Sequence, residues 1–163
     1  MKTRRFLSSI LSGLVLLLSG CYSFSGSGLP SGLRTVEIFQ VVDRTRQPEL
    51  ADRATQDIVA EYRRNGALRP VDRDGQSRLD VWIANYSHTP QTYDLSGNVS
   101  RFRVIVTLET KFVDLRDETV LFEAKDISGA YDYDPLKETE SDAKLKALQE
   151  AVSKLVANTV SGW

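Results

Sequence analysis

Hydrophobic and polar residues alternate most regularly between Val99 and Leu115. A period of two predicts a strand with one buried face and one face turned to solvent or to a partner. The apolar face carries Phe102, Val104, Val106, Leu108 and Phe112, and the polar face carries Arg101, Arg103, Thr107, Glu109 and Lys111. We therefore predict a strand over 99–115 that contributes its apolar face to the core.

Three further segments have the composition of strands. Residues 33–42 are rich in Val, Ile and Phe, and residues 79–86 alternate between apolar and polar side chains. Residues 120–127 follow a short polar connection, so they should pair antiparallel with the strand over 99–115. The side chains expected to point inward from that segment are those of Val120, Phe122 and Ala124. Residues 68–71 leave room for one extra short strand.

Two segments repeat apolar residues every three to four positions, which predicts helices. The first is expected over 48–65, because Pro48 suits the first turn of a helix and Gly66 stops it. Its buried stripe should consist of Leu50, Ala54, Ile58 and Tyr62. The second is expected over 140–161, behind a capping box of Thr and Asp at 139–142. Its buried stripe should consist of Leu145, Leu148, Val152, Leu155 and Thr159.

The order of these elements is strand, helix, three or four strands, helix. It predicts an α+β domain with a four-stranded, mostly antiparallel sheet and both helices packed on its apolar face. With 163 residues, 41% of them hydrophobic, the chain is long enough for one such domain with a real core.

Residues 1–20 have a different character from the rest of the chain. They combine a basic start with an apolar run and small residues before Cys21, which is the layout of a secretory signal. The segment Leu18-Ser19-Gly20-Cys21 resembles the bacterial lipobox, which implies acylation of Cys21 and cleavage before it. Tyr22 follows in place of the Asp that retains lipoproteins in the inner membrane, which implies the outer membrane, facing the periplasm. An ordinary signal with a chance Cys is the alternative.

The segment after the signal is rich in Ser and Gly. We interpret residues 21–32 as a flexible tether to the lipid and residues 33–163 as the folded domain. Without the three basic residues of 1–20, the chain from Cys21 onward has 18 basic and 22 acidic side chains, a net charge of −4. That balance argues against nucleic acid as the main partner, because phosphate binding normally requires a basic excess.

The chain offers little for catalysis. Its single His and single Cys exclude clustered zinc sites, intramolecular disulfides and iron–sulfur ligation. His88 adjoins Ser87, but neighbours on a strand point to opposite faces, so we interpret His88 as a loop residue near Pro90. Asp132 and Asp134 are interpreted as solvated loop carboxylates. Residues 72–75 are interpreted as a turn, not a calcium loop. We therefore predict no catalytic residue, no metal, no cofactor and no enzymatic activity.

Several short motifs, in order, resemble the LptE family of lipopolysaccharide-assembly lipoproteins. They are Cys21-Tyr22-Ser23-Phe24-Ser25-Gly26, Leu29-Pro30-Ser31, Thr35-Val36-Glu37-Ile38 leading into Asp43-Arg44-Thr45, Pro48-Glu49-Leu50, and Leu68-Arg69-Pro70-Val71-Asp72. The resemblance implies a four-stranded sheet with two helices on one side. It also implies a plug that sits inside the LptD outer-membrane β-barrel, helps that barrel assemble and contacts lipopolysaccharide in transit.

Two other interpretations stay open. The fold of periplasm-facing regulatory or secretion-pore lipoproteins of the LpoB and CsgG kind also begins with a strand, an Asp-Arg-Thr turn and a helix. A purely structural outer-membrane lipoprotein is the third possibility. Co-purification of a β-barrel, of a peptidoglycan synthase or of nothing specific separates the three.

The polar face of the strand over 99–115 supplies the candidate binding residues. Arg101, Arg103 and Lys111 are expected to stand together on the side away from the core. Arginine can bind phosphates through paired hydrogen bonds, which suits either the anionic glycolipid or the wall of the barrel. A solvated face that keeps the protein soluble is the alternative.

Overall fold

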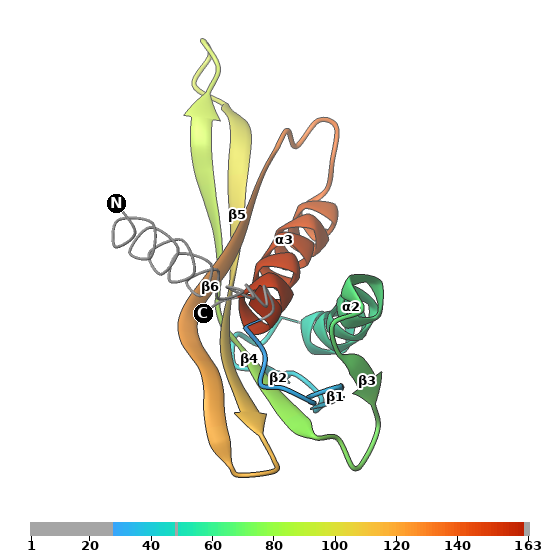
Figure 1. Cartoon of the computed structure of the whole chain (residues 1–163). Helices are drawn as coiled ribbons and strands as arrows, with labels where there is room; N and C mark the ends of the chain where they lie inside the picture. The colour runs from blue at the N-terminus through green and yellow to red at the C-terminus, as the bar shows by residue number, and fades with distance from the viewer. Residues whose placement is uncertain (1–27, 48, 162–163) are drawn as a thin grey trace, which may run out of the picture.

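A computed structural model describes residues 28–47 and 49–161 (Figure 1). The predicted signal, Cys21, most of the tether and the predicted helix start at Pro48 lie outside the described residues. With the labels of Figure 1, the elements are β1 Thr35–Ile38, β2 Val42–Asp43, α2 Leu50–Asn65, β3 Arg69–Val71, β4 Ser77–Tyr93, β5 Val99–Asp114, β6 Thr119–Tyr133 and α3 Glu140–Ser161.

One sheet of six strands runs through the domain in the order β3-β1-β4-β5-β6, with β2 also paired to β4. The α+β class is therefore confirmed, but the predicted sheet of four mostly antiparallel strands is only roughly matched. β4, β5 and β6 pair antiparallel, whereas β1 pairs parallel with both β3 and β4. Parallel neighbours need a crossover connection, and α2 supplies it between β1 and β3.

The strand predicted over 33–42 is split into β1 and β2. β1 and β2 pair with different parts of β4, at Ser77–Leu79 and at Trp82–Ile83. β4 and β6 also extend beyond the strands predicted at 79–86 and 120–127, because their ladders with β5 continue past the polar residues that seemed to end them in the sequence. The resulting β4–β5 hairpin projects beyond α3 in Figure 1.

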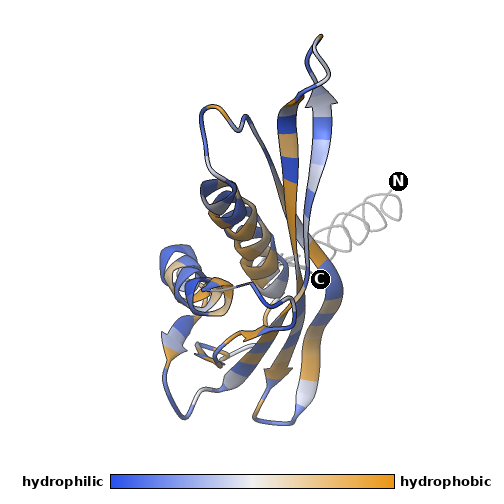
Figure 2. Cartoon of the chain, turned by 180° about the vertical axis from the view of Figure 1, so that it is seen from behind, coloured by the Kyte–Doolittle hydropathy of each residue, from blue (hydrophilic) through white to orange (hydrophobic). Residues whose placement is uncertain are grey.

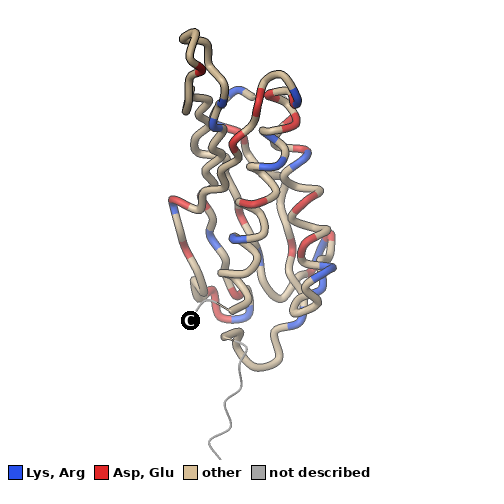
Figure 3. The backbone as a smooth tube through the Cα atoms, turned by 90° about the horizontal axis from the view of Figure 1, so that it is seen from above, with Lys and Arg blue, Asp and Glu red and all other residues tan. Residues whose placement is uncertain are grey.

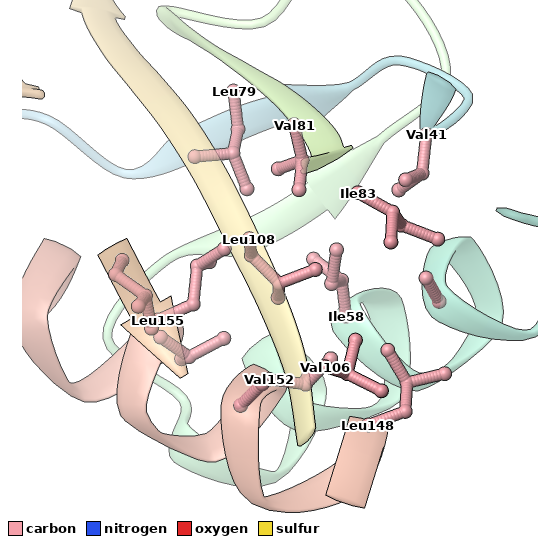
Figure 4. Close-up of a cluster of buried hydrophobic side chains, with 14 of the residues drawn as sticks. Val41, Ile58, Leu79, Val81, Ile83, Val106, Leu108, Leu148, Val152 and Leu155 are labelled. Atoms are coloured by element: carbon pink, nitrogen blue, oxygen red, sulfur yellow. The ribbon is translucent and has the colours of Figure 1, made fainter. Parts of the chain in front are cut away.

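α2 and α3 both cover one face of the sheet, as predicted (Figures 1 and 4). The predicted stripe of α2 is confirmed in full, because all four of its residues are buried. α2 ends at Gly66, whose φ of 76° is the left-handed conformation of a helix C-cap. Tyr62 and Thr159 join the two helices through a buried hydroxyl pair 2.6 Å apart.

The inward face of β5 is confirmed. Val104, Val106 and Leu108 are fully buried, and Phe102 packs against the core while half-buried. Orange and blue segments alternate along the long strands in Figure 2, as expected for a sheet with one apolar face.

The inward face predicted for residues 120–127 is partly wrong. Phe122 and Ala124 pack against the core, but Val120 is 44% exposed. The register shifts next to Phe112, so Leu121 has no cross-strand partner and is buried in place of Val120. A bulge of this kind changes which side chains of a strand face inward.

The capping box of α3 is confirmed. The Asp142 carboxylate accepts the Thr139 N–H, and the Asp142 N–H donates to the Thr139 hydroxyl. Of the predicted stripe, Leu145 is only half-buried and the other residues are buried. The side chains of α3 that the prediction missed are Ala143, Ala147, Ala151, Val156 and Val160, all buried.

Candidate functional site

The three predicted cationic residues lie on the face of β5 away from α2 and α3. Arg101 and Lys111 are ten positions apart on this strand, which corresponds to roughly 33 Å at the rise of an extended chain. The expectation that all three stand together is therefore wrong, because a strand spreads its residues along its length. Arg101 and Arg103 remain neighbours on one face.

Arg103 is committed to a partner within the domain. Its Nε and Nη2 donate to the two carboxylate oxygens of Asp132 at 2.6 and 2.7 Å, across the β5–β6 ladder. The Arg103 hydrogen bonds, with the charges of Arg103 and Arg101, hold the pKa of Asp132 below its usual range. Asp132 is thus a strand residue and not the solvated loop residue that we predicted, because β6 continues to Tyr133.

Asp134 follows directly in the β6–α3 connection, as predicted. Its carboxylate accepts the Leu136 N–H at 2.9 Å and an ion pair from Lys137 at 3.3 Å. The backbone hydrogen bond, together with the Lys137 and Arg101 charges, lowers its pKa. Arg101 is exposed and has no hydrogen bond of its own within the described residues, so it is the free cation of the predicted set at this end of the sheet.

Lys111 has acidic residues on both neighbouring strands. It lies between Asp80 of β4 and Glu123 of β6 in the ladder, with no ion pair among the residues that the structure describes. A ligand phosphate beside Lys111 would meet these two carboxylates as well. Arg101 also acts on two carboxylates, but Arg103 and Lys137 already pair with these, whereas Glu123 beside Lys111 has no ion pair within the described residues. This difference favours Arg101 over Lys111 as a contact for an anionic ligand.

An aromatic cluster that the sequence analysis missed lies on the inner side of the same end. His88, Phe102 and Tyr133 form a triangle of rings: the centroid of His88 lies 4.6 Å from that of Phe102 and 5.8 Å from that of Tyr133, and the latter two are 5.7 Å apart. The Tyr133 hydroxyl lies 3.0 Å from His88 Nε2. His88 is therefore not the loop residue that we predicted, since β4 runs on to Tyr93.

Glu140, the first residue of α3, ties this cluster to the helix. It accepts a hydrogen bond of 2.6 Å from the Tyr86 hydroxyl and lies 3.3 Å from His88 Nδ1. Burial, followed by the hydrogen bond and charge of Glu140, raises the pKa of Tyr86. Tyr86, His88 and Tyr133 thus connect β4 and β6 to the N-terminus of α3. We call this end of the domain, which carries the β4–β5 turn, the distal end.

A second group of contacts between β6 and α3 lies next to this cluster. The Lys146 ammonium of α3 donates to the Tyr131 hydroxyl at 3.0 Å and to the Glu138 carboxylate at 2.8 Å. A shallow pocket next to it has Arg101, Tyr131, Asp132 and Glu138 among its lining residues. The signal that could have revealed this end is the alternation of Tyr and Asp over 131–134, which places aromatic rings inward and carboxylates outward.

The distal end also exposes apolar side chains. Leu95 in the β4–β5 turn and Leu136 in the β6–α3 connection are almost fully exposed, and Tyr93 at the end of β4 is exposed as well. Within 28–47 and 49–161, no three His, Asp or Glu side chains are grouped to hold a metal ion. Among these residues there is also no helix with the length and apolarity to cross a membrane. The arrangement offers charged and apolar groups for contact with a partner.

The chain matches the family model of LptE, lipopolysaccharide-assembly, over residues 33–160. The chain belongs to the LptE family. The match spans all strands and helices of the domain except the last residue of α3, which makes the chain a lipopolysaccharide-assembly lipoprotein of a non-enzymatic family. No curated protein matches it.

Solved structures share the fold of this LptE-family chain at low identity. They include the hypothetical protein CT253 from Chlamydia trachomatis, with a TM-score of 0.55, 9% identity, and coverage of 77% of this chain and 97% of that one. The uncharacterized lipoprotein B from Nitrosomonas europaea has a TM-score of 0.53 and 15% identity, covering 82% and 88%. A minor lipoprotein from Acinetobacter baumannii has a TM-score of 0.52 and 12% identity, covering 77% and 91%.

Proposed function

We propose that this LptE-family protein plugs an LptD-like outer-membrane β-barrel, helps that barrel assemble and contacts lipopolysaccharide on its way to the outer membrane. The family match over 33–160 carries the proposal. The fold supports it, because α2 and α3 cover only one face of the sheet (Figure 1) and leave the face that carries the polar side chains of β5 for the wall of a barrel. A regulatory or secretion-pore role of the LpoB and CsgG kind is not favoured.

The protein is held at the periplasmic side of the outer membrane by acyl chains on Cys21. Several acyl chains together give stable anchoring, because each buried methylene contributes about 0.8 kcal/mol. We expect Cys21→Ala to be released from the membrane or to accumulate as a precursor, as cell fractionation and mass spectrometry of the mature N-terminus would show. An unmodified Cys21, or cleavage at another residue, would contradict this.

The plug role itself is tested by affinity purification from outer membranes. The parent protein should recover a β-barrel of the LptD kind, whereas recovery of a peptidoglycan synthase would favour the alternative. Ser96→Ala, a conservative change in the exposed β4–β5 turn, is the control variant and should recover the same partner as the parent.

Arg101 is the residue of the predicted set that we expect to contact lipopolysaccharide or the barrel. Arg101→Glu should leave the melting temperature near that of the parent, because the side chain is exposed, and should weaken lipopolysaccharide binding or barrel capture, most clearly at low salt. Lys111→Gln, compared with Arg101→Gln, is the matched control on the same face, because Lys111→Glu would place three carboxylates side by side on β4, β5 and β6. Equal effects of the two variants would return Arg101 to the solvated-face interpretation.

Arg103 needs a different substitution. Arg103→Glu would place two carboxylates opposite each other on β5 and β6, which destabilises a sheet. A double reversal of Arg101 and Arg103 would therefore mix loss of binding with loss of folding. Arg103→Gln removes the charge without adding a repulsion.

A further inference from the structure

The described chain begins at the opposite end of the domain from the aromatic cluster. Leu29 packs against the core, and the Ser31 carbonyl accepts a hydrogen bond of 3.1 Å from Arg116 in the β5–β6 turn. The contacts of the domain thus start four residues before Leu33, where we predicted the domain to begin. Seven Cα–Cα steps separate Cys21 from Gly28, and they can span at most about 25 Å. This end of the domain therefore lies near the point of lipid attachment.

Three exposed arginines gather at this end, and we call them the basic corner: Arg34, Arg63 and Arg69. The Arg69 N–H donates to the Arg34 carbonyl at 2.8 Å, so these residues are neighbours on the β1–β3 edge. Arg63 and Arg69 line one pocket at the end of α2, together with Gly66. Figure 3 shows Lys and Arg positions, together with Asp and Glu positions, at the lower end of the tube, where the described chain begins.

None of the three guanidinium groups has an ion pair or hydrogen bond within the described residues. The acidic residues of the neighbouring segments are only partly paired: Asp114 pairs with Arg116, whereas the exposed Asp72, Asp74, Asp117 and Glu118 have no ion pair within the described residues. Glu61 pairs with Arg64, and Asp72 and Asp74 flank Arg73 in the β3–β4 connection. The basic corner is therefore a group of three neighbouring cations without an ion pair, next to exposed carboxylates of the β3–β4 and β5–β6 connections, on a chain whose net charge from Cys21 onward is −4.

The fold itself accounts for only one of the three arginines. Arg63 stands in the last turn of α2, where a cation complements the negative end of the helix dipole. Arg69 is on an edge strand and Arg34 immediately precedes β1, so neither has that role.

We propose that the basic corner docks on the anionic headgroups of the membrane that holds Cys21, as a second, electrostatic attachment beside the acyl chains. The inference rests on the proposed acylation of Cys21. A lipid surface fits because the tether brings these arginines close to it and because lipid phosphates pair with arginine. The contact would fix the orientation of the domain, with the β4–β5 hairpin and the free Arg101 directed away from the headgroups.

The test uses the mature acylated protein in vesicles. Acylation blocks the only native thiol, so Ala67→Cys can carry a fluorophore at the corner, while Ser96→Cys carries one in the β4–β5 turn as a distal reference. Vesicles of phosphatidylcholine, with or without phosphatidylglycerol, contain a headgroup-labelled quenching lipid. We expect phosphatidylglycerol to increase quenching at position 67 and not at position 96, and we expect high salt to reverse the increase.

Charge variants identify the residues responsible. Arg34→Gln, Arg63→Gln and Arg69→Gln together should lower the contact equilibrium constant by roughly a hundredfold, since each arginine near an anionic surface is worth a factor of roughly five. The matched triple of Arg53→Gln, Lys125→Gln and Lys137→Gln removes the same charge elsewhere and should leave quenching near that of the parent. Barrel capture by the corner variant should be unchanged.

Several results would overturn the inference. If quenching of the parent did not change with phosphatidylglycerol or with salt, the membrane contact of the basic corner would be contradicted. The proposed plug role would be unaffected, because the acylated chain would still capture the barrel. Equal losses from both triple variants, or abolition by inorganic phosphate at constant ionic strength, would also contradict the membrane contact. A mature chain with an unmodified Cys21 would overturn the inference and the proposed lipid attachment together.

Discussion

Gly129→Ala should destabilise the domain by about 3 kcal/mol or more, as expected for overpacking against backbone that cannot move aside. A Cβ atom at position 129 would lie 2.0 Å from the Ala147 carbonyl oxygen and 2.4 Å from the Ala151 nitrogen. Both are backbone atoms of α3, so the helix as a whole would have to shift away from β6. Urea unfolding followed by circular dichroism measures the loss.

The neighbouring residue provides the control. Ala130 is exposed on the other face of β6, so Ala130→Ser should change the free energy of unfolding by less than about 0.5 kcal/mol. If Gly129→Ala unfolded at the same urea concentration as Ala130→Ser, α3 would not approach β6 as closely as the structure shows.

This close approach explains why the core of α3 was only partly predicted. The apolar repeat of larger residues correctly identifies the helix, but it assigns Leu145 to the core. The contact with Gly129 instead requires small side chains, and Ala147 and Ala151 supply them. Alanine is common in helices for its propensity alone, so its presence in the sequence does not reveal a close contact.

The sequence predicted correctly those parts of the sheet whose structure follows from the alternation of hydrophobic and polar residues. The faces of β5 follow from its alternation, whereas the parallel pairing of β1 depends on where α2 returns the chain, which no local pattern encodes. The same limit applies to the candidate site. That Arg103 belongs to Asp132 depends on the β5–β6 register, and the bulges that set this register leave no clear mark in the sequence.

The distal aromatic cluster was missed for a related reason. His88 stands among Ser, Thr and Pro residues, which are typical of loops. The ladder with β5 extends the strand through them, because His88 pairs with Val104 and packs on Phe102. Tertiary pairing thus overrides local propensity at the end of the molecule that carries the proposed contact residue.

Val106→Asp should reduce the free energy of unfolding by about 4 kcal/mol or more, because it places an unpaired carboxylate in the core. Val106 is fully buried and lies among Ile58, Leu148 and Val152 between the sheet and both helices (Figure 4). Ile105→Asp is the matched control, since the adjacent side chain points to the polar face and is half-exposed. Thermal melting of the two variants beside the parent compares the faces directly.

The pH dependence of the loss tests its cause. Burial would raise the pKa of an Asp at position 106 above that of the unfolded chain, because it disfavours the charged form. The folded state would then bind the extra proton, so the stability of Val106→Asp should recover in part as the pH falls through the raised pKa. Ile105→Asp should show no such recovery. If Val106→Asp melted with the parent at neutral pH, the inward face of β5 would be assigned wrongly, and the polar face proposed for the barrel would lose its basis.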